Sequence, residues 1–105
     1  MDNPEMRNVI EGALTYLRTH GWIKGSSLDV STGKVCTVGA VCYSLAEANP
    51  VYDLGVAVNA ISLLRSKLPS SVYSYPETDI AAYNDDPNTT QQDIENLFEK
   101  TIADL

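Results

Sequence analysis

Histidine, cysteine and basic residues are scarce in this sequence, and their scarcity argues against several kinds of site. The 105 residues include one histidine, two cysteines and seven lysines or arginines. One histidine and two cysteines do not complete a familiar zinc set, and no C-x-x-C pair is present. The glycine patterns of P-loop and dinucleotide-binding sites are also missing. We therefore expect no metal and no cofactor.

Long apolar runs are absent as well, since none exceeds four residues. A membrane-spanning helix needs about 20 predominantly apolar residues. The N-terminal MDNPEMRNVIEG has acids and a proline where a signal peptide needs bases and an apolar stretch. We expect a cytoplasmic protein without membrane association, in which Cys36 and Cys42 are reduced and mostly buried.

Basic residues are nearly missing from the C-terminal part of the chain. Residues 1–75 carry six acids and six bases, whereas residues 76–105 carry eight acids and only Lys100, which accounts for the net charge of −7. This balance argues against direct nucleic-acid binding, which depends on lysine and arginine neutralising phosphates. It predicts an anionic surface on which a basic protein could dock.

Apolar residues recur at spacings of three and four along most of the chain, which predicts helices. A first helix is expected after Asn3-Pro4 and before Gly21, because these residues suit its two ends. A capping box formed by Thr90 and Asp93 is expected to begin the last helix. Three further helices are predicted near residues 37–49, 53–67 and 78–84. The one at 53–67 has the widest apolar face and is expected to be the most buried.

Turn-forming residues at positions 24–34 separate the first two main helices. Short segments at residues 28–30 and 34–36 are predicted to pair as a small β-hairpin. The fold class is therefore mostly α, a compact bundle of four to five short helices with this hairpin between the first two. The length favours a single helical domain over residues 1–105.

Catalytic and metal-binding constellations have little support in the sequence. Cys36 or Cys42 paired with His20 would be a nucleophile and base, but His20 is explained by the end of the first helix. The acidic turn near residue 86 does not match a calcium loop, because Gln91 and Leu97 stand where glycine and glutamate are needed. We expect no enzymatic activity.

Acidic and aromatic residues of the C-terminal part are candidate partner contacts. The last helix has only Lys100 to pair with its acids, whereas a solvated helix face usually intersperses lysines. Tyrosines in a serine-rich segment are typical interface anchors. A solvated acidic face and a tyrosine lid over the core are the alternatives. The candidate partner-binding residues are Tyr73, Tyr75, Asp85, Asp86, Asp93, Glu95 and Glu99.

Three motifs carry a resemblance to a known family. They are Gly21-Trp22-x-x-Gly25, then Asp29-x-x-x-Gly33-x-x-Cys36-x-x-Gly39-Ala40, then Ile80-Ala81-x-Tyr83-Asn84-Asp85 with Thr90 after it. From about residue 10 to 102, the chain resembles a small family of unknown function found in actinobacteria and their phages. Tyr83 stands where that family usually has tryptophan, and the loop before the cysteine is shorter.

The resemblance implies a mostly α fold and brings no established activity. The motif positions it marks are Trp22, Gly25, Gly33, Cys36, Gly39, Ala40, Tyr83, Asn84 and Asp85. Aromatic packing, a close helix approach at Gly39 and capping by Asn84 and Asp85 would explain them structurally, and a binding site is the alternative.

Taken together, the sequence predicts a small phage-encoded accessory protein of the host cytoplasm that binds a host or phage protein through its acidic C-terminal face. Two alternatives stay open. One is a small-molecule- or nucleotide-modifying enzyme with a pocket near Trp22, Cys36, Tyr83 and Asn84. The other is a self-assembling homodimer.

Overall fold

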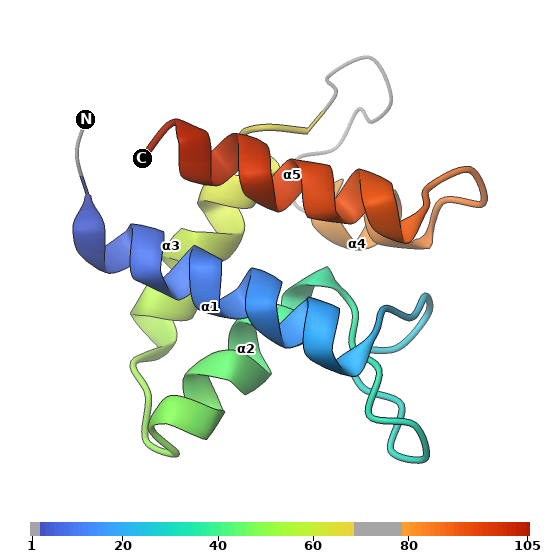
Figure 1. The fold of residues 1–105 in the computed structure, drawn as a ribbon, viewed down its shortest axis with the longest axis horizontal. Helices are drawn as coiled ribbons and strands as arrows, with labels where there is room; N and C mark the ends of the chain where they lie inside the picture. The colour runs from blue at the N-terminus through green and yellow to red at the C-terminus, as the bar shows by residue number, and fades with distance from the viewer. Residues whose placement is uncertain (1–2, 69–78) are drawn as a thin grey trace.

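The computed structural model describes residues 3–68 and 79–105, which form five helices, as the mostly α prediction expected, and almost no β-structure. The helices are α1 (Pro4–His20), α2 (Thr37–Ala48), α3 (Leu54–Arg65), α4 (Asp79–Asp85) and α5 (Gln91–Ala103). In Figure 1, α1 crosses the front of the molecule and α5 lies above it in the opposite direction. None of the helices in these two ranges is long and apolar enough to cross a membrane.

Local capping signals set most helix ends where the sequence placed them. The Asn3 side chain accepts a hydrogen bond from the Met6 N–H at 3.1 Å and begins α1. Thr90 and Asp93 form the predicted capping box, each side chain accepting from the other residue's backbone N–H. The N-cap of α2 is Cys36, a residue type that the common capping preferences do not favour.

Helix α3 contacts all four other helices, but it is not the most buried helix, which corrects that part of the sequence prediction. Helix α1 contacts α2, α3 and α5, and five of its apolar side chains are buried. Helix α3 buries Ala57, Ala60 and Leu64 but leaves Leu54 and Val58 exposed. A wide apolar face does not show which side of a helix points inward, because that orientation depends on how the neighbouring helices pack.

The segment between α1 and α2 contains much less β-structure than a hairpin. Val35 forms one antiparallel bridge with Leu28 and one parallel bridge with Trp22, and both bridges are isolated. The turn between Asp29 and Gly33 closes through a 2.7 Å backbone hydrogen bond, with Gly33 at a positive φ of 80°. The predicted hairpin is therefore reduced to the antiparallel bridge beside this turn.

Gly39 allows the close approach that the sequence predicted, but α2 approaches the backbone of this segment and not another helix. A Cβ at Gly39 would stand 2.1 Å from the Ser27 carbonyl oxygen. The same carbonyl accepts a hydrogen bond from the Cys36 N–H at 3.3 Å, so it has little freedom to move. The start of α2 therefore packs on the loop only because position 39 has no side chain.

Replacing Gly39 by alanine should lower the free energy of unfolding by at least about 2 kcal/mol, because backbone atoms of the loop must move. Gly12 in α1 is the matched control, since nothing lies within 4 Å of its ideal Cβ. Gly12→Ala should instead stabilise by about 0.5–1 kcal/mol through helix propensity. Chemical denaturation measures both, and equal effects would contradict the close packing at Gly39.

Candidate functional site

Asn84, near the C-terminal end of α4, is the centre of a buried polar network. Its side chain is only 1% exposed. Its Oδ1 accepts hydrogen bonds from Trp22 Nε1 at 2.7 Å, from the Thr37 N–H at 3.0 Å and from Thr37 Oγ1 at 2.7 Å. One amide oxygen therefore joins α4 to the segment after α1 and to the first turn of α2.

The amide nitrogen of Asn84 is satisfied as well. Its Nδ2 donates to the Ile23 carbonyl at 3.1 Å and to Asp85 Oδ1 at 3.0 Å. The same Asp85 oxygen accepts a 2.8 Å hydrogen bond from the Gly25 N–H. The Asn84 side chain therefore links segments that are distant in sequence and is not the helix cap that the sequence suggested. The Asp85 side chain accepts a hydrogen bond from a loop N–H and does not cap a helix end.

Lys24 also contacts this network. Its Nζ donates to the Asp86 carbonyl and lies 5.4 Å from the centre of the Trp22 ring. This distance is within the range of a cation–π contact. The indole of Trp22 is therefore held by Asn84 at its N–H and by Lys24 at its face.

A cavity of about 310 Å³ lies beside the Asn84 network. Its polar wall includes Cys36, Asn84 and Asp85, and its apolar wall includes Val38, Ile80 and Ala81. Trp22 and Tyr83, which the sequence placed near the same pocket, do not line this cavity. Tyr83 lines a separate cavity of about 190 Å³ with Asp93 and Lys100, and its pKa is raised by burial and by Asp93 and Asp86.

Cys36 is held in a structural role at the start of α2. Its Sγ accepts a hydrogen bond from the Gly39 N–H at 3.3 Å. Burial raises the pKa of the thiol, and the nearby Asp85 carboxylate raises it further, although hydrogen bonds from the helix start act in the opposite direction. The thiol is free but protonated at neutral pH, which does not suit a nucleophile.

The other candidate catalytic residues lie in different cavities. Cys42 lines a cavity of about 280 Å³ with Tyr43 and Tyr52. Both cysteines are half-buried, so the expectation of mostly buried thiols was too strong. His20 is the last residue of α1, and its ring stacks on Tyr16 with centroids 3.8 Å apart. No cavity described here is lined by His20 together with a cysteine.

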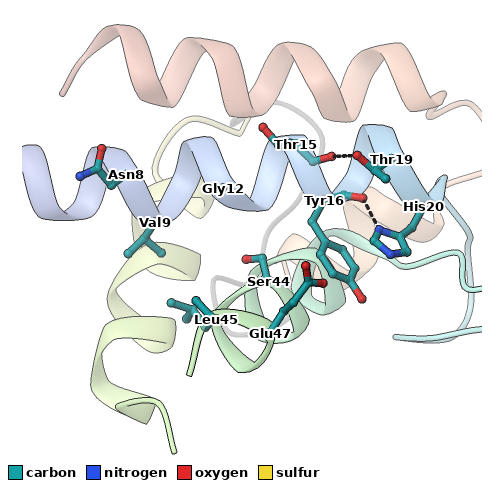
Figure 2. Close-up of a pocket in the computed structure, with 11 residues that line it drawn as sticks. Asn8, Val9, Gly12, Thr15, Tyr16, Thr19, His20, Ser44, Leu45 and Glu47 are labelled. Carbon is teal, nitrogen blue, oxygen red and sulfur yellow. Dashed lines mark hydrogen bonds between the residues drawn. The ribbon is translucent and has the colours of Figure 1, made fainter. Parts of the chain in front are cut away.

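The largest of these cavities, about 460 Å³, is the groove between α1 and α2. Figure 2 shows His20 next to Tyr16 at one end of this groove and Val9 with Leu45 toward the other. His20 Nδ1 is 3.0 Å from the Tyr16 carbonyl oxygen, and Thr19 Oγ1 donates to the Thr15 carbonyl. These polar groups are engaged within α1 itself and do not converge on a point in the groove.

The acids of α5 have cationic partners from a distant part of the chain. Arg18 of α1 reaches Glu95 at 2.6 Å through its Nε and Glu99 through its Nη2. These two contacts raise the pKa of the guanidinium above its usual value. Lys67 pairs with Asp104 and lowers the pKa of that carboxyl group. Lys100 is the only basic residue within α5, as the sequence showed, but Arg18 and Lys67 supply partners from outside that helix.

The remaining candidate partner residues serve mainly local structure. Asp93 completes the capping box of α5, and Asp86 Oδ1 accepts from the Asn88 N–H at 2.8 Å. Tyr73 and Tyr75 lie outside the described residues. Of the other motif positions, Ala40 is fully buried in α2. Within the described ranges, no group of three or more histidine, cysteine or acidic residues is placed to hold a metal ion.

Two features of the structure were missed by the sequence reasoning. Thr37 is 1% exposed and contributes two of the hydrogen bonds to Asn84, yet nothing in the local sequence distinguishes it from an ordinary first-turn threonine. The second is an exposed apolar strip on α3, the α3 stripe, formed by Leu54 and Val58, which are one turn apart and 69% and 60% exposed. The unusual apolar breadth of α3 was the signal for it.

Comparison with family models places this chain in a family. A model described as a family of unknown function (DUF6197) matches residues 1–104, so the chain belongs to that family. Neither curated proteins nor solved structures gave a match. The family membership agrees with the uncharacterised domain family that the motifs suggested and assigns no activity.

Replacing Asn84 by alanine should lower the free energy of unfolding by at least about 3 kcal/mol, because the Thr37 N–H and the Trp22 N–H lose a buried acceptor. Trp22→Phe, which removes one donor and leaves the amide oxygen with two others, should cost about 1–2 kcal/mol. Chemical denaturation measures both variants. A smaller effect for Asn84→Ala than for Trp22→Phe would contradict the central position of Asn84.

The Cys36 thiol should be unreactive at neutral pH. In a Cys42→Ala background, folded protein should react with iodoacetamide at pH 8 at least about 10-fold more slowly than the same chain in urea. Because the thiol's pKa is higher in the folded state, this group's contribution to stability should fall as the pH rises above the ordinary thiol pKa. Equal or faster alkylation of the folded protein would contradict the structural role.

Proposed function

We propose that this member of the family is a non-catalytic protein that acts by binding another protein, and that the α3 stripe is its binding surface. The observation that carries the proposal is the exposure of Leu54 and Val58, one turn apart at the N-terminal end of α3. Single exposed apolar residues are ordinary, whereas adjacent ones on one helix face form a patch of the kind that interaction sites use. Their exposure is compatible with stability because Ala57, Ala60 and Leu64 anchor the opposite face.

The chemistry of the buried network supports a function without catalysis. The Asn84 amide uses both its oxygen and its nitrogen to join backbone segments. Cys36 is a protonated helix cap, and His20 lines a different cavity. Nucleophilic catalysis needs a nucleophile and a base within hydrogen-bond reach of each other. These residues instead stabilise the fold that presents α3.

The choice of surface differs from the acidic face that the sequence favoured. Arg18 holds Glu95 and Glu99, and Lys67 holds Asp104, so the anionic character of α5 is partly neutralised within the chain. Reversing Glu95 and Glu99 to lysine would place two new cations beside Arg18 and disturb the contact between α1 and α5. Such a variant would therefore not separate partner binding from folding.

The origin and location of the protein are part of the same proposal. The motif resemblance supports an actinobacterial or phage source, and the composition supports the host cytoplasm. A partner from the host or from the phage is consistent with an accessory role. Direct nucleic-acid binding is not proposed, because the acids outnumber the bases two to one.

Small-molecule binding is a second candidate, favoured by the cavity beside Asn84. Its walls combine an apolar side with the polar groups of Cys36 and Asp85, a combination found in many ligand sites. If this cavity binds nucleotides or other small metabolites, the ligand should raise the melting temperature. No shift at millimolar concentrations would remove this candidate and leave the α3 proposal unaffected.

Substitution on the α3 stripe should abolish partner capture without unfolding the protein. We expect tagged Leu54→Asn/Val58→Asn protein to capture at least about 90% less of the stripe's partner than the wild type does in the host, an untagged copy of this chain included, because its apolar contacts are replaced by hydrated amides. Quantitative mass spectrometry measures the loss. Val30→Asn is the matched control, since Val30 is exposed but lies outside the helices. Unchanged capture by the double variant would contradict the proposal.

A further inference from the structure

We propose that the partner of the α3 stripe is a second copy of this chain, bound by antiparallel packing of α3 against α3 across a twofold axis. This inference rests on the proposed function, because it identifies the protein that occupies the same surface. It is carried by the order of apolar, small and charged residues along the exposed face of α3.

The exposed face of α3 has an apolar half and a small, polar half. Leu54 and Val58 are one turn apart, and Ser62 and then Arg65 continue the same face toward the C-terminal end. All four are exposed, whereas Ala57, Ala60 and Leu64 on the opposite face are buried. The buried face prevents α3 from turning its apolar half inward.

A hollow beside the small half of this face is suited to a side chain from the partner. It measures about 340 Å³ and is lined by Met6 of α1, by Asn3, the N-cap of that helix, and by Asn59, Ser62 and Leu63 of α3. Leu54 and Ser62 are equally distant from Val58, since each is four residues away from it along the helix. Antiparallel packing centred on Val58 therefore places the partner's Leu54 opposite Ser62 and the hollow, in both copies at once.

The charges at the two ends of α3 complement each other in the same arrangement. Asp53, the N-cap, and Arg65, the last helical residue, are exposed, and no charged residue stands between them in the sequence. In the antiparallel dimer Asp53 lies near the partner's Arg65 at each end, and the helix dipoles oppose each other. In a parallel pair, like charges would meet at both ends. This pattern is self-complementary, which a twofold axis between identical chains requires.

The rest of the charge distribution also favours this face for self-association. The excess of acids lies in residues 76–105, so contact between two copies through that part of the chain would bring like charges together. The exposed face of α3 carries one acid and one base at its ends and none between. Low charge at the centre of a contact surface is characteristic of protein interfaces.

Sedimentation of the full chain tests the dimer. The wild type should dimerise reversibly within the concentration range of about 1 μM to 1 mM. Val58→Asp should raise the dissociation constant at least about 100-fold, because the substitution occurs twice near the axis and buries unpaired charge. Val30→Asp, an equally drastic change at an exposed valine outside the helices, should leave the constant unchanged. Circular dichroism should show both variants folded.

Disulfide trapping tests the orientation independently of affinity. In a Cys36→Ser/Cys42→Ala background, Val58→Cys should form a covalent dimer under mild oxidation, because position 58 approaches its own copy across the axis. Serine retains the cap of α2. Val30→Cys should not crosslink above the background. Equal crosslinking at the two positions would overturn the α3 interface.

Charge reversal tests the antiparallel direction. Arg65→Glu should weaken the dimer about 5- to 10-fold by facing the partner's Asp53, and adding Asp53→Asn should recover about half of the lost binding free energy, because it removes the repulsion without restoring the attraction. Asparagine keeps the N-cap of α3, so the second change removes only the charge. An unchanged or tighter Arg65→Glu dimer, or no recovery on adding Asp53→Asn, would overturn the antiparallel pairing.

The dimer inference and the proposed function fail in different ways. If the wild type stays monomeric to 1 mM, the second copy is not the partner and this inference is overturned. The proposed function then still stands if Leu54→Asn/Val58→Asn reduces capture of other proteins. If the wild type dimerises but Val58→Asp has no effect on the dissociation constant, the α3 interface is overturned.

Discussion

The fold depends on one amide side chain that joins two distant segments of the chain, residues 22–23 and the start of α2, to α4. Asn84 accepts from the indole of Trp22 and from the first turn of α2, and it donates to the loop at Ile23. These segments are more than 45 residues away in sequence, and apart from isolated bridges the loop has no ladder of its own. Since a buried N–H without an acceptor costs about 1–3 kcal/mol, the amide determines where the loop can lie. Gly39 then permits the close contact between this loop and α2.

The electrostatics of the chain are organised in the same non-local way. The C-terminal acids are opposed by Arg18 from α1 and by Lys67 from the residues after α3. These are exposed ion pairs, so each contributes little to stability. They matter more for recognition. Because Arg18 already pairs with acids of α5, this surface attracts a basic partner less strongly than the net charge of −7 suggests.

Sequence reasoning succeeded where the determinant is local and failed where it is tertiary. Asn3 and the Thr90–Asp93 pair act within one helical turn, so their roles could be predicted from spacing alone. The motif positions Trp22 and Asn84 were found through resemblance, but their hydrogen bond joins residues 62 positions apart and has no local signature. Arg18 was missed for the same reason. The orientation of α3 could not be predicted, because its apolar residues nearly surround the helix.

The rotation of α3 follows from the size of its side chains. Alanines at positions 57 and 60 allow α3 to approach the bundle closely, and Leu64 is buried beside them. Turning Leu54 and Val58 inward would replace these alanines by larger side chains against a core that is already filled by Ile10, Leu17 and Phe98. Packing in the interior therefore forces apolar residues outward on α3. The surface that results is a consequence of the core, and it is available for binding without any change in the buried network around Asn84.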